Sequence, residues 1–302
     1  MRAAYTAQCP DLTPDYAAVE SWADIEVFIK THPLPVMLKP GNLMKSLYVT
    51  RNDDMQSLQA NYERMLKQLP DVYRRYHLGA PEIIIEECMI GSMHTVAGFA
   101  DADGVPHLAQ TIVDCTMASE IGIPDTFLFS RRLPSSLSAD NQVLLLQAAE
   151  RAICAMGLIN CAAHVELILT NDGPKIIEVG ARLGGYRPAM YRLGNGIDLY
   201  AALLAIANGN TPNLVMTKTT SVCVIEIFPE SDGTLVQMPD ETFVRSLPSF
   251  YSVKWSAKIG DSIGLASSGH KAVAVVTLVN TAHDTLLFDE SQIRNNFRVL
   301  VG

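Results

Sequence analysis

The sequence lacks the features that mark membrane, secreted and nucleic-acid-binding proteins. Among its 302 residues no apolar run approaches the ~20 residues that a membrane-spanning helix needs. The first residues, MRAAYTAQCPDLTPD, contain no apolar stretch typical of a signal peptide. No block of Lys or Arg stands out, and the net charge is −9. We therefore expect a cytoplasmic protein that has no contact with nucleic acid or membrane.

Cysteines are few and carry no metal-binding pattern. None of them shows CxxC spacing, which argues against a zinc site and against a disulfide framework. They are expected to be reduced small hydrophobic residues: Cys9, Cys88, Cys115, Cys154, Cys161 and Cys223. A content of 48% hydrophobic and 18% charged residues is typical of a globular chain, with room for one large domain or two to three smaller ones.

The pattern of apolar residues changes along the chain. Helical spacing predicts helices over residues 21–32, 53–69, 140–158 and 196–210. Short apolar runs predict strands over residues 34–40, 46–51 and 81–91. Residues 219–302 are β-rich, with a late helix and a final strand, and residues 211–218 have the composition of a linker.

Two apolar runs and a turn predict a hairpin in the segment HVELILTNDGPKIIEVGARLGG, residues 164–185. Residues 171–173 separate the runs, and a three-residue loop with Gly last is a favoured connection. Centring the loop on Asp172 pairs Thr170 with Pro174, Ile168 with Ile176, and Glu166 with Glu178. Alternation along the second strand predicts one face with Glu178, Gly180 and Arg182, and another with Ile177, Val179 and Ala181.

The predicted pairing places two carboxylates side by side. Directly opposed residues have Cβ atoms about 5 Å apart, so Glu166 and Glu178 repel each other unless a cation lies between them. A hard divalent ion with oxygen ligands would fill that place. The alternative is a solvated hairpin face that carries two acids by chance.

Four features occur in a recognisable order along the chain. Lys39 precedes the loop PGNLMKS, the strand EIIIEECMIG follows, and the hairpin acids lead into EVGARLGG. This order resembles the ATP-grasp superfamily of carboxylate–amine and carboxylate–thiol ligases, from about residue 2 to residue 209. The resemblance implies an α+β fold of two α+β lobes and a β-rich C-terminal domain. The implied boundaries are 1–88 for the small lobe, 89–210 for the large lobe with the metal site, and 219–302 for the C-terminal domain.

The resemblance assigns a nucleotide site to the first lobe. Lys39 takes the place of the lysine that contacts the nucleotide phosphates, where an ammonium acts as a point charge. Ser46 matches a residue of the loop that covers the phosphates. Glu86, Glu87 and Met89 occupy the strand that hydrogen-bonds adenine, mostly through backbone groups. An ordinary solvated lysine and a strand ending in solvent are the alternatives.

The same resemblance assigns the metal site and the phosphoryl-transfer chemistry. Glu166 and Glu178 look like the magnesium ligands, and Mg²⁺ usually takes one or two carboxylates plus substrate phosphates. Arg182 looks like the arginine that stabilises the transferring phosphoryl group. A salt bridge between Arg182 and Glu178 is not expected, because an extended strand would separate them by ~13 Å. His164, on the same face, is expected to be a structural neighbour.

The sequence also departs from the family pattern. The phosphate loop has only Gly41, with Tyr48 where a glycine is common. Met93 stands where a ribose-binding glutamate is common, and Gly180 where many members have an asparagine ligand. The usual N-terminal α/β domain and a second nucleotide-binding lysine have no counterpart before the first predicted helix. The isolated chain is therefore expected to bind Mg·ATP weakly and to ligate little without the missing piece.

The function implied is ATP- and Mg-dependent ligation of a small-molecule carboxylate, such as an amino acid, to an amine through an acyl phosphate. Arg131, Arg132 and Arg187 are candidates for gripping a carboxylate, with surface charge as the alternative. Two other interpretations are a non-catalytic nucleotide-binding module and one part of a split ligase. A partner chain or a homo-oligomer would then replace the absent domain.

Overall fold

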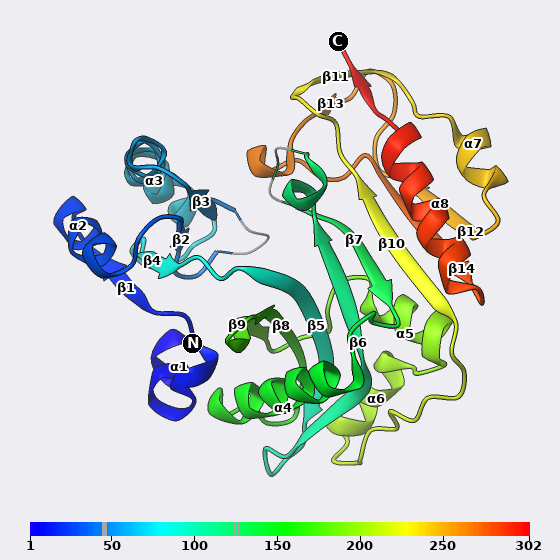
Figure 1. Cartoon of the computed structure of the whole chain (residues 1–302), viewed down its shortest axis with the longest axis horizontal. Coiled ribbons are helices and arrows are strands. Elements are labelled where there is room, and N and C mark those ends of the chain that lie inside the picture. The colour runs from blue at the N-terminus through cyan, green and yellow to red at the C-terminus, as the bar shows by residue number, and fades with distance from the viewer. Residues whose placement is uncertain (44–46, 124, 126) are drawn as a thin grey trace. The chain divides into compact units, whose positions relative to one another are not determined.

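The structure is a computed structural model that describes residues 1–43, 47–123, 125 and 127–302 (Figure 1). Contacts divide the chain into two compact units. The smaller unit consists of residues 14–89 together with Arg2, and the larger unit consists of Met1, residues 3–13 and residues 90–302. Both units mix helices with antiparallel sheet, which confirms the predicted α+β class.

The smaller unit is built on a four-stranded antiparallel sheet. Its strand order is β1 (Tyr16–Val19), β4 (Ile83–Glu87), β2 (Val36–Pro40) and β3 (Thr50–Asn52). Two helices, α2 (Trp22–Thr31) and α3 (Met55–Arg75), bury their apolar faces in a core that includes Ile25, Leu38 and Ile85. The core sets which strand residues point outward, and so it positions the side chains of Lys39 and Glu86.

Helix α3 continues past Pro70, where the sequence predicted its end. Proline in a helix interior removes one hydrogen bond and costs ~3 kcal/mol. Buried residues recur at helical spacing on both sides of the proline, with Met65 and Leu69 before it and Tyr73 after it. Each fully buried large apolar side chain contributes ~1.5–3 kcal/mol, so the packing of these residues offsets the proline.

An eight-stranded antiparallel sheet forms the larger unit. In spatial order its strands are β12 (Phe250–Trp255), β14 (Ala274–Asn280), β10 (Ser221–Ile227), β7 (Leu128–Leu133), β6 (Pro106–Met117), β5 (Gly91–Ala100), β8 (Cys161–Thr170) and β9 (Gly173–Gly180). A small sheet contains β13 (Ser262–Ile263), β11 (Gly233–Gln237) and β15 (Leu300–Val301). Residues 219–302 therefore contribute strands to the large sheet, and the boundary predicted at 210–219 does not coincide with a boundary between the two units.

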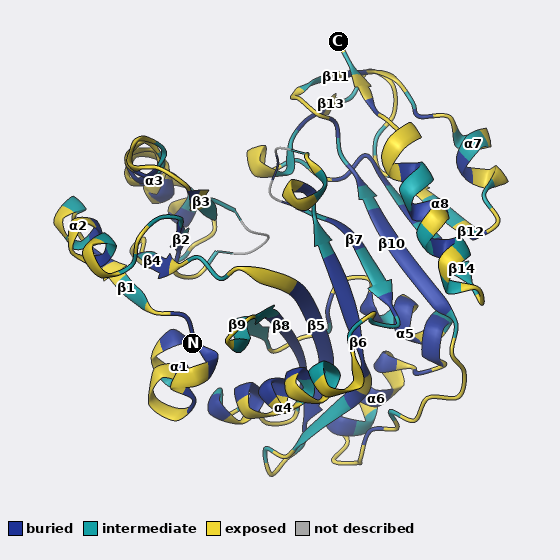
Figure 2. Cartoon of the chain, viewed as in Figure 1, coloured by how far each residue is buried: buried dark blue, intermediate teal, exposed yellow. Residues whose placement is uncertain are grey.

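Helices cover both faces of the large sheet, as Figure 2 shows by the dark, buried strands between them. The helices are α1 (Arg2–Gln8), α4 (Ala139–Ala155), α5 (Arg187–Asn195), α6 (Leu199–Ala207), α7 (Glu241–Ser246) and α8 (His283–Asn296). Along β5, Val96 joins the core under α4, while Ala97 and Phe99 join the core under α5 and α6. No helix among the described residues is long and apolar enough to cross a membrane.

Candidate active site

The hairpin β8–β9 places Glu166 directly opposite Glu178, as the sequence predicted. The predicted pairs nearer the turn are wrong. Thr170 pairs with Gly173, so the loop has two residues, and Ile176 pairs with Leu167. A β-bulge at Ile177 inserts one extra residue and restores the register at the two glutamates.

The bulge also changes which residues share a face. The sequence predicted that Ile177 and Val179 point the same way, and this is wrong. Val179 packs on the α4 core with Ile176, whereas Ile177 packs on the core under α5 and α6. The extra residue shifts the alternation by one position, so residues before and after the bulge exchange faces. Glu178 lies after the bulge and keeps its predicted place opposite Glu166.

One face of the large sheet carries several of the candidate residues. Across the strands, Glu178 pairs with Glu166, and Glu166 pairs with Thr95 of β5. Met93 lies two residues before Thr95 on β5 and pairs with Cys115, which in turn pairs with Arg131. Residues paired across strands point to the same side, as do residues two apart along one strand. The face therefore carries Glu178, Glu166, His164, Thr95, Cys115, Arg131 and Glu226.

Glu166 is held in its ionised form by its neighbours. Nε2 of buried His164 lies 3.2 Å from Glu166 Oε1. Burial alone would raise the pKa of the Glu166 carboxyl, but the hydrogen bond from His164 and the charges of Arg187 and Arg182 lower it below its ordinary value. Burial lowers the pKa of His164, which favours the neutral imidazole. An ionised carboxylate next to a neutral histidine keeps negative charge on this face.

Two carboxylates make up the candidate metal site. The side chains of Glu166 and Glu178 are 20% and 46% exposed, so their oxygens are within reach of a ligand. The described residues contain no group of three or more His, Cys, Asp or Glu side chains that could hold a metal. Two acids fit Mg²⁺ in the presence of phosphates, because that ion keeps several waters and shares its other ligands with the nucleotide.

Arg182 does contact Glu178, against the prediction. Its Nη2 lies 3.8 Å from Glu178 Oε1. Strand β9 ends at Gly180, and the backbone N–H of Arg182 donates to the carbonyl of Gly180 at 2.8 Å, so the chain turns back instead of extending. Both side chains are about half-exposed, and a pair in such surroundings contributes at most ~1 kcal/mol. Arg182 is therefore weakly tethered beside the acids.

The glycines of the motif allow a close approach to this face. A Cβ on Gly184 would lie 2.6 Å from His164 Nδ1 and 2.6 Å from Arg187 Cγ. Any larger residue at position 184 would push these side chains away. The ARLGG segment thus lets the backbone pass close to His164 while Arg187 turns inward.

Arg187 is a buried cation on this face. It is 2% exposed, its Nε donates to Thr95 Oγ1 at 2.9 Å, and its Nη1 donates to the carbonyl of Gly185 at 3.3 Å. Among the described residues no carboxylate lies within 4 Å of it, and burial lowers the pKa of its guanidinium. The surface-charge interpretation of Arg187 is therefore wrong.

Arg131 belongs to a network that the sequence did not reveal. Its Nη2 donates to Glu226 at 2.8 Å, and the hydroxyl of Tyr186 donates to the other oxygen of Glu226 at 2.8 Å. The Tyr186 ring lies 5.2 Å from the Arg131 guanidinium, and Tyr186 adopts a φ of 63°, which is rare for a residue other than glycine. Arg132 points to the opposite face and donates to Glu290. No sequence motif marks Tyr186 or Glu226, because only the sheet order brings β7 beside β10.

In the smaller unit, Glu86 joins two cations. Arg2 Nε and Nη2 donate to its carboxylate at 2.7 and 3.0 Å, and Lys39 Nζ lies 2.7 Å from it. Burial to 2% exposure would raise the pKa of Glu86, but the two cations outweigh it and lower that pKa. Lys39 is thus an ion-paired residue and not a solvated strand-end lysine.

The other predicted nucleotide residues are less constrained. Glu87 is exposed and Met89 is half-buried just beyond β4. Ser46 lies outside the described residues. Arg2 is a further residue of this site that no local sequence pattern predicts, because its pairing with Glu86 spans 84 residues of chain.

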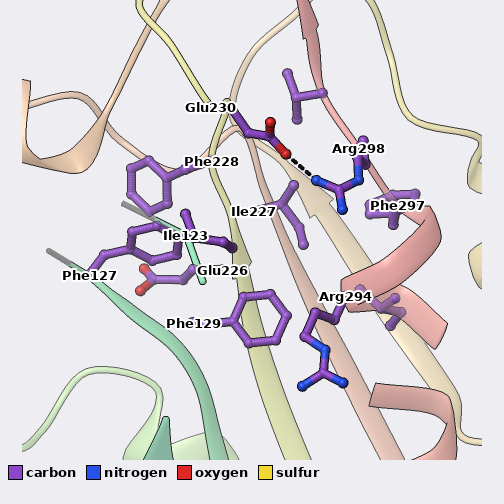
Figure 3. Close-up of a pocket in the computed structure, with 12 residues that line it drawn as sticks. Ile123, Phe127, Phe129, Glu226, Ile227, Phe228, Glu230, Arg294, Phe297 and Arg298 are labelled. Atoms are coloured by element: carbon purple, nitrogen blue, oxygen red, sulfur yellow. Dashed lines mark hydrogen bonds and ion pairs between the residues drawn. The ribbon is translucent and has the colours of Figure 1, made fainter. Parts of the chain in front are cut away.

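A small cavity lies beside the C-terminal helix α8, as Figure 3 shows. Its volume is about 40 Å³, and an ion pair between Arg298 and Glu230 borders it. It is lined by Ile123, Phe127, Phe129, Glu226, Ile227, Phe228, Glu230, Ile293, Arg294, Phe297, Arg298 and Val299. Sites for small organic ligands are usually ~300–1,000 Å³, so this cavity does not fit a nucleotide.

Comparison with known proteins identifies the family. The model of the ATP-grasp domain matches residues 32–189, more than half of the chain. The chain belongs to the ATP-grasp family. It is 28% identical over 204 residues to alanine–anticapsin ligase of Bacillus subtilis, covering 62% of this chain and 42% of that protein. It is 27% identical over 205 residues to human carnosine synthase 1, covering 65% of this chain and 24% of that protein.

A solved structure shows the same fold over the whole chain. The L-amino acid ligase of Bacillus licheniformis superposes with a TM-score of 0.82 at 18% identity, covering 100% of this chain and 72% of that one. The chain spans half or less of the length of the curated relatives that it matches first. The fold and the family are therefore established by comparison, and both agree with the resemblance seen in the sequence.

Proposed function

We propose that the chain catalyses the ATP- and Mg²⁺-dependent joining of a carboxylate to an amine through an acyl phosphate. The observation that carries this proposal is the direct opposition of Glu166 and Glu178 on a sheet face that also presents guanidinium groups. Relatives named as ligases of amino acids support an amino acid as one substrate. The acceptor would be an amine, so the new bond would be a C–N bond.

Glu166 and Glu178 would hold the metal ion. Like-charged residues in direct opposition destabilise a sheet, and a bound cation removes that repulsion. When bound, the ion would neutralise charge on the phosphates during transfer of the γ-phosphoryl group. His164 keeps Glu166 ionised and oriented through its hydrogen bond, so the carboxylate is available without a change of protonation.

Arg182 would stabilise the transferring phosphoryl group. Its ion pair with Glu178 is long and half-exposed, so little energy is needed to move the guanidinium toward a phosphate. A guanidinium suits this work because it donates two parallel hydrogen bonds to phosphate oxygens.

The nucleotide would be bound by residues of the smaller unit. Lys39 would contact the phosphates, Ser46 would contribute from the covering loop, and the segment with Glu86, Glu87 and Met89 would hold adenine. The ion pair with Glu86 fixes the Lys39 ammonium in place before the nucleotide arrives. Preorganised charge of this kind needs no rearrangement on binding.

Arg131 and Arg187 would bind the substrate carboxylate. Both lie on the face of Glu166. The charge of Arg187 lowers the pKa of the Glu166 carboxyl, and the charge of Arg131 lowers the pKa of Arg187. Arg187 has only neutral hydrogen-bond acceptors among the described residues. A buried guanidinium of this kind favours an anion as an additional partner.

Hydroxylamine tests the reaction without knowledge of the amine. It attacks an acyl phosphate directly, so an amino acid, ATP and Mg²⁺ should yield an amino-acid hydroxamate together with ADP and phosphate. The product should be absent without Mg²⁺ and absent with the Glu166→Gln variant. Nucleotide binding without any hydroxamate, over a screen of amino acids, would instead support a binding module or one part of a split ligase and refute the proposed chemistry for the chain alone.

A further inference from the structure

A second cluster with catalytic geometry lies on the opposite face of the large sheet. Ser92 and His94 alternate with Met93 and Thr95 along β5, so they point away from the face of Glu166. The Ser92 Oγ lies 2.6 Å from His94 Nε2, and His94 Nδ1 lies 2.9 Å from Asp114 Oδ1 on β6. No step of the proposed ligation uses these three residues.

The hydrogen bonds fix the direction of the protons. Asp114 is an acceptor at neutral pH, because its bonds to His94, Ser135 and Ser136 outweigh burial and lower its pKa to about 2. His94 must therefore donate from Nδ1, and in the neutral imidazole Nε2 is left with its lone pair. That lone pair can only accept, so the Ser92 hydroxyl is the donor.

The acid and the histidine of the cluster are buried, whereas the serine is exposed. His94 and Asp114 are 3% and 5% exposed, and Asp114 also accepts hydrogen bonds from the Ser136 backbone N–H at 2.7 Å and from the hydroxyls of Ser135 and Ser136. Ser92 is exposed to solvent. A buried acid that orients the base, and a base bonded to an accessible hydroxyl, are the arrangement that activates a serine.

We propose that Ser92, His94 and Asp114 form a nucleophilic site that accepts acyl groups from small carboxylic esters. Ser92 Oγ bonds to the ester carbonyl carbon while its proton passes to His94 Nε2. The bond from that carbon to the alkoxide breaks, and His94 returns the proton to the alcohol that leaves. Water then attacks the acyl-serine with His94 as base, which releases the acid and restores the free hydroxyl.

A fluorophosphonate reagent tests this site independently of the ligase. Ser92 Oγ would displace fluoride from phosphorus, so HF leaves and the intact chain gains the mass of one reagent molecule less HF; peptide mapping should place the adduct on Ser92. The Ser92→Ala variant, altered only at an exposed position, should show no adduct. Ser246→Ala is the matched control, because that serine is also exposed but donates to the carbonyl of Phe243, and it should label as the native chain does.

The rate of labelling separates an activated serine from a structural one. Loss of a positioned acid–base group lowers rates by roughly 10²–10⁴-fold, so Asp114→Asn should label on the order of 10²-fold more slowly if circular dichroism shows it folded. A native chain that gains no adduct, or a Ser92→Ala chain that labels as fast as the native one, would overturn the proposal. Release of nitrophenol from p-nitrophenyl acetate by the native chain, absent in Ser92→Ala, is the second expected result and requires no change at the buried residues.

Discussion

Replacing Glu86 by glutamine should destabilise the smaller unit strongly. The carboxylate is 2% exposed and accepts from Arg2 at 2.7 and 3.0 Å and from Lys39 at 2.7 Å. Glutamine keeps the shape but removes the charge, so two cations lose their shared counter-charge. Breaking a buried ion pair by removing one partner costs about 3–5 kcal/mol, and we expect a loss near the lower end because the amide oxygen still accepts one bond.

The chain offers a matched control and a local probe for this prediction. Glu87 is the next residue, is exposed, and should tolerate glutamine within about 0.5 kcal/mol. Trp22 and Trp255 are the two tryptophans of the sequence, and Trp22 belongs to the smaller unit. Urea unfolding followed by fluorescence in a Trp255→Phe background therefore reports on Trp22. A loss below about 1 kcal/mol for Glu86→Gln, or a loss equal to that of Glu87→Gln, would refute the reasoning.

The same ion pairs give the prediction a pH signature. The pKa of Glu86 lies below its ordinary value of 4.5, so its contribution to stability is present above that value and is lost as the pH falls through the folded pKa. The stability difference between the native chain and Glu86→Gln should therefore shrink in acid. A difference that stays constant down to about pH 2 would show that packing, not charge, carries the effect.

Three other predictions follow from the larger unit. Glu178→Gln without metal should leave the free energy of unfolding within about 1 kcal/mol of the native value, because relief of repulsion from Glu166 offsets the weak pair with Arg182; a larger loss in urea would contradict this. Arg187→Met should keep or raise that free energy but lower hydroxamate formation at least about tenfold, since the buried guanidinium has neutral partners; strong destabilisation would make its role structural. The pKa of Asp114 is lowered from 3.8 to about 2, so its ionised carboxylate should add roughly 2 kcal/mol to the free energy of unfolding above pH 4, and this contribution should disappear toward pH 2. The measurement is the difference in the free energy of unfolding between the native chain and Asp114→Asn at each pH.

The opposition of Glu166 and Glu178 was predictable because the hairpin pattern is local. The two errors in its derivation, a loop one residue too long and a missing bulge at Ile177, cancel at the glutamates. Bulges depend on how the strand fits its neighbours and have no signature in this segment. The predicted separation of Arg182 from Glu178 is wrong for a different reason, because the strand ends at Gly180 and the chain then turns back.

Contacts between distant segments could not be predicted. The Arg2–Glu86 pair and the Tyr186–Glu226–Arg131 network join residues 84, 40 and 95 positions apart. Helix α3 likewise runs through Pro70, because burial of the residues that follow outweighs the local preference. Local pattern thus predicted the strands and helices near the site, while the network partners depend on the order of strands in the sheet.

Calorimetric titration of the chain with ATP, with and without Mg²⁺, tests the central claim most directly. Binding should depend on Mg²⁺ and should weaken at least about tenfold, or ~1.4 kcal/mol, in Glu166→Gln and in Glu178→Gln. Glu150→Gln, at an exposed position on α4, is the control and should bind as the native chain does. ATP binding of equal strength without Mg²⁺, or unchanged Mg·ATP affinity in both folded glutamate variants, would contradict the assignment of Glu166 and Glu178 as the metal-binding pair.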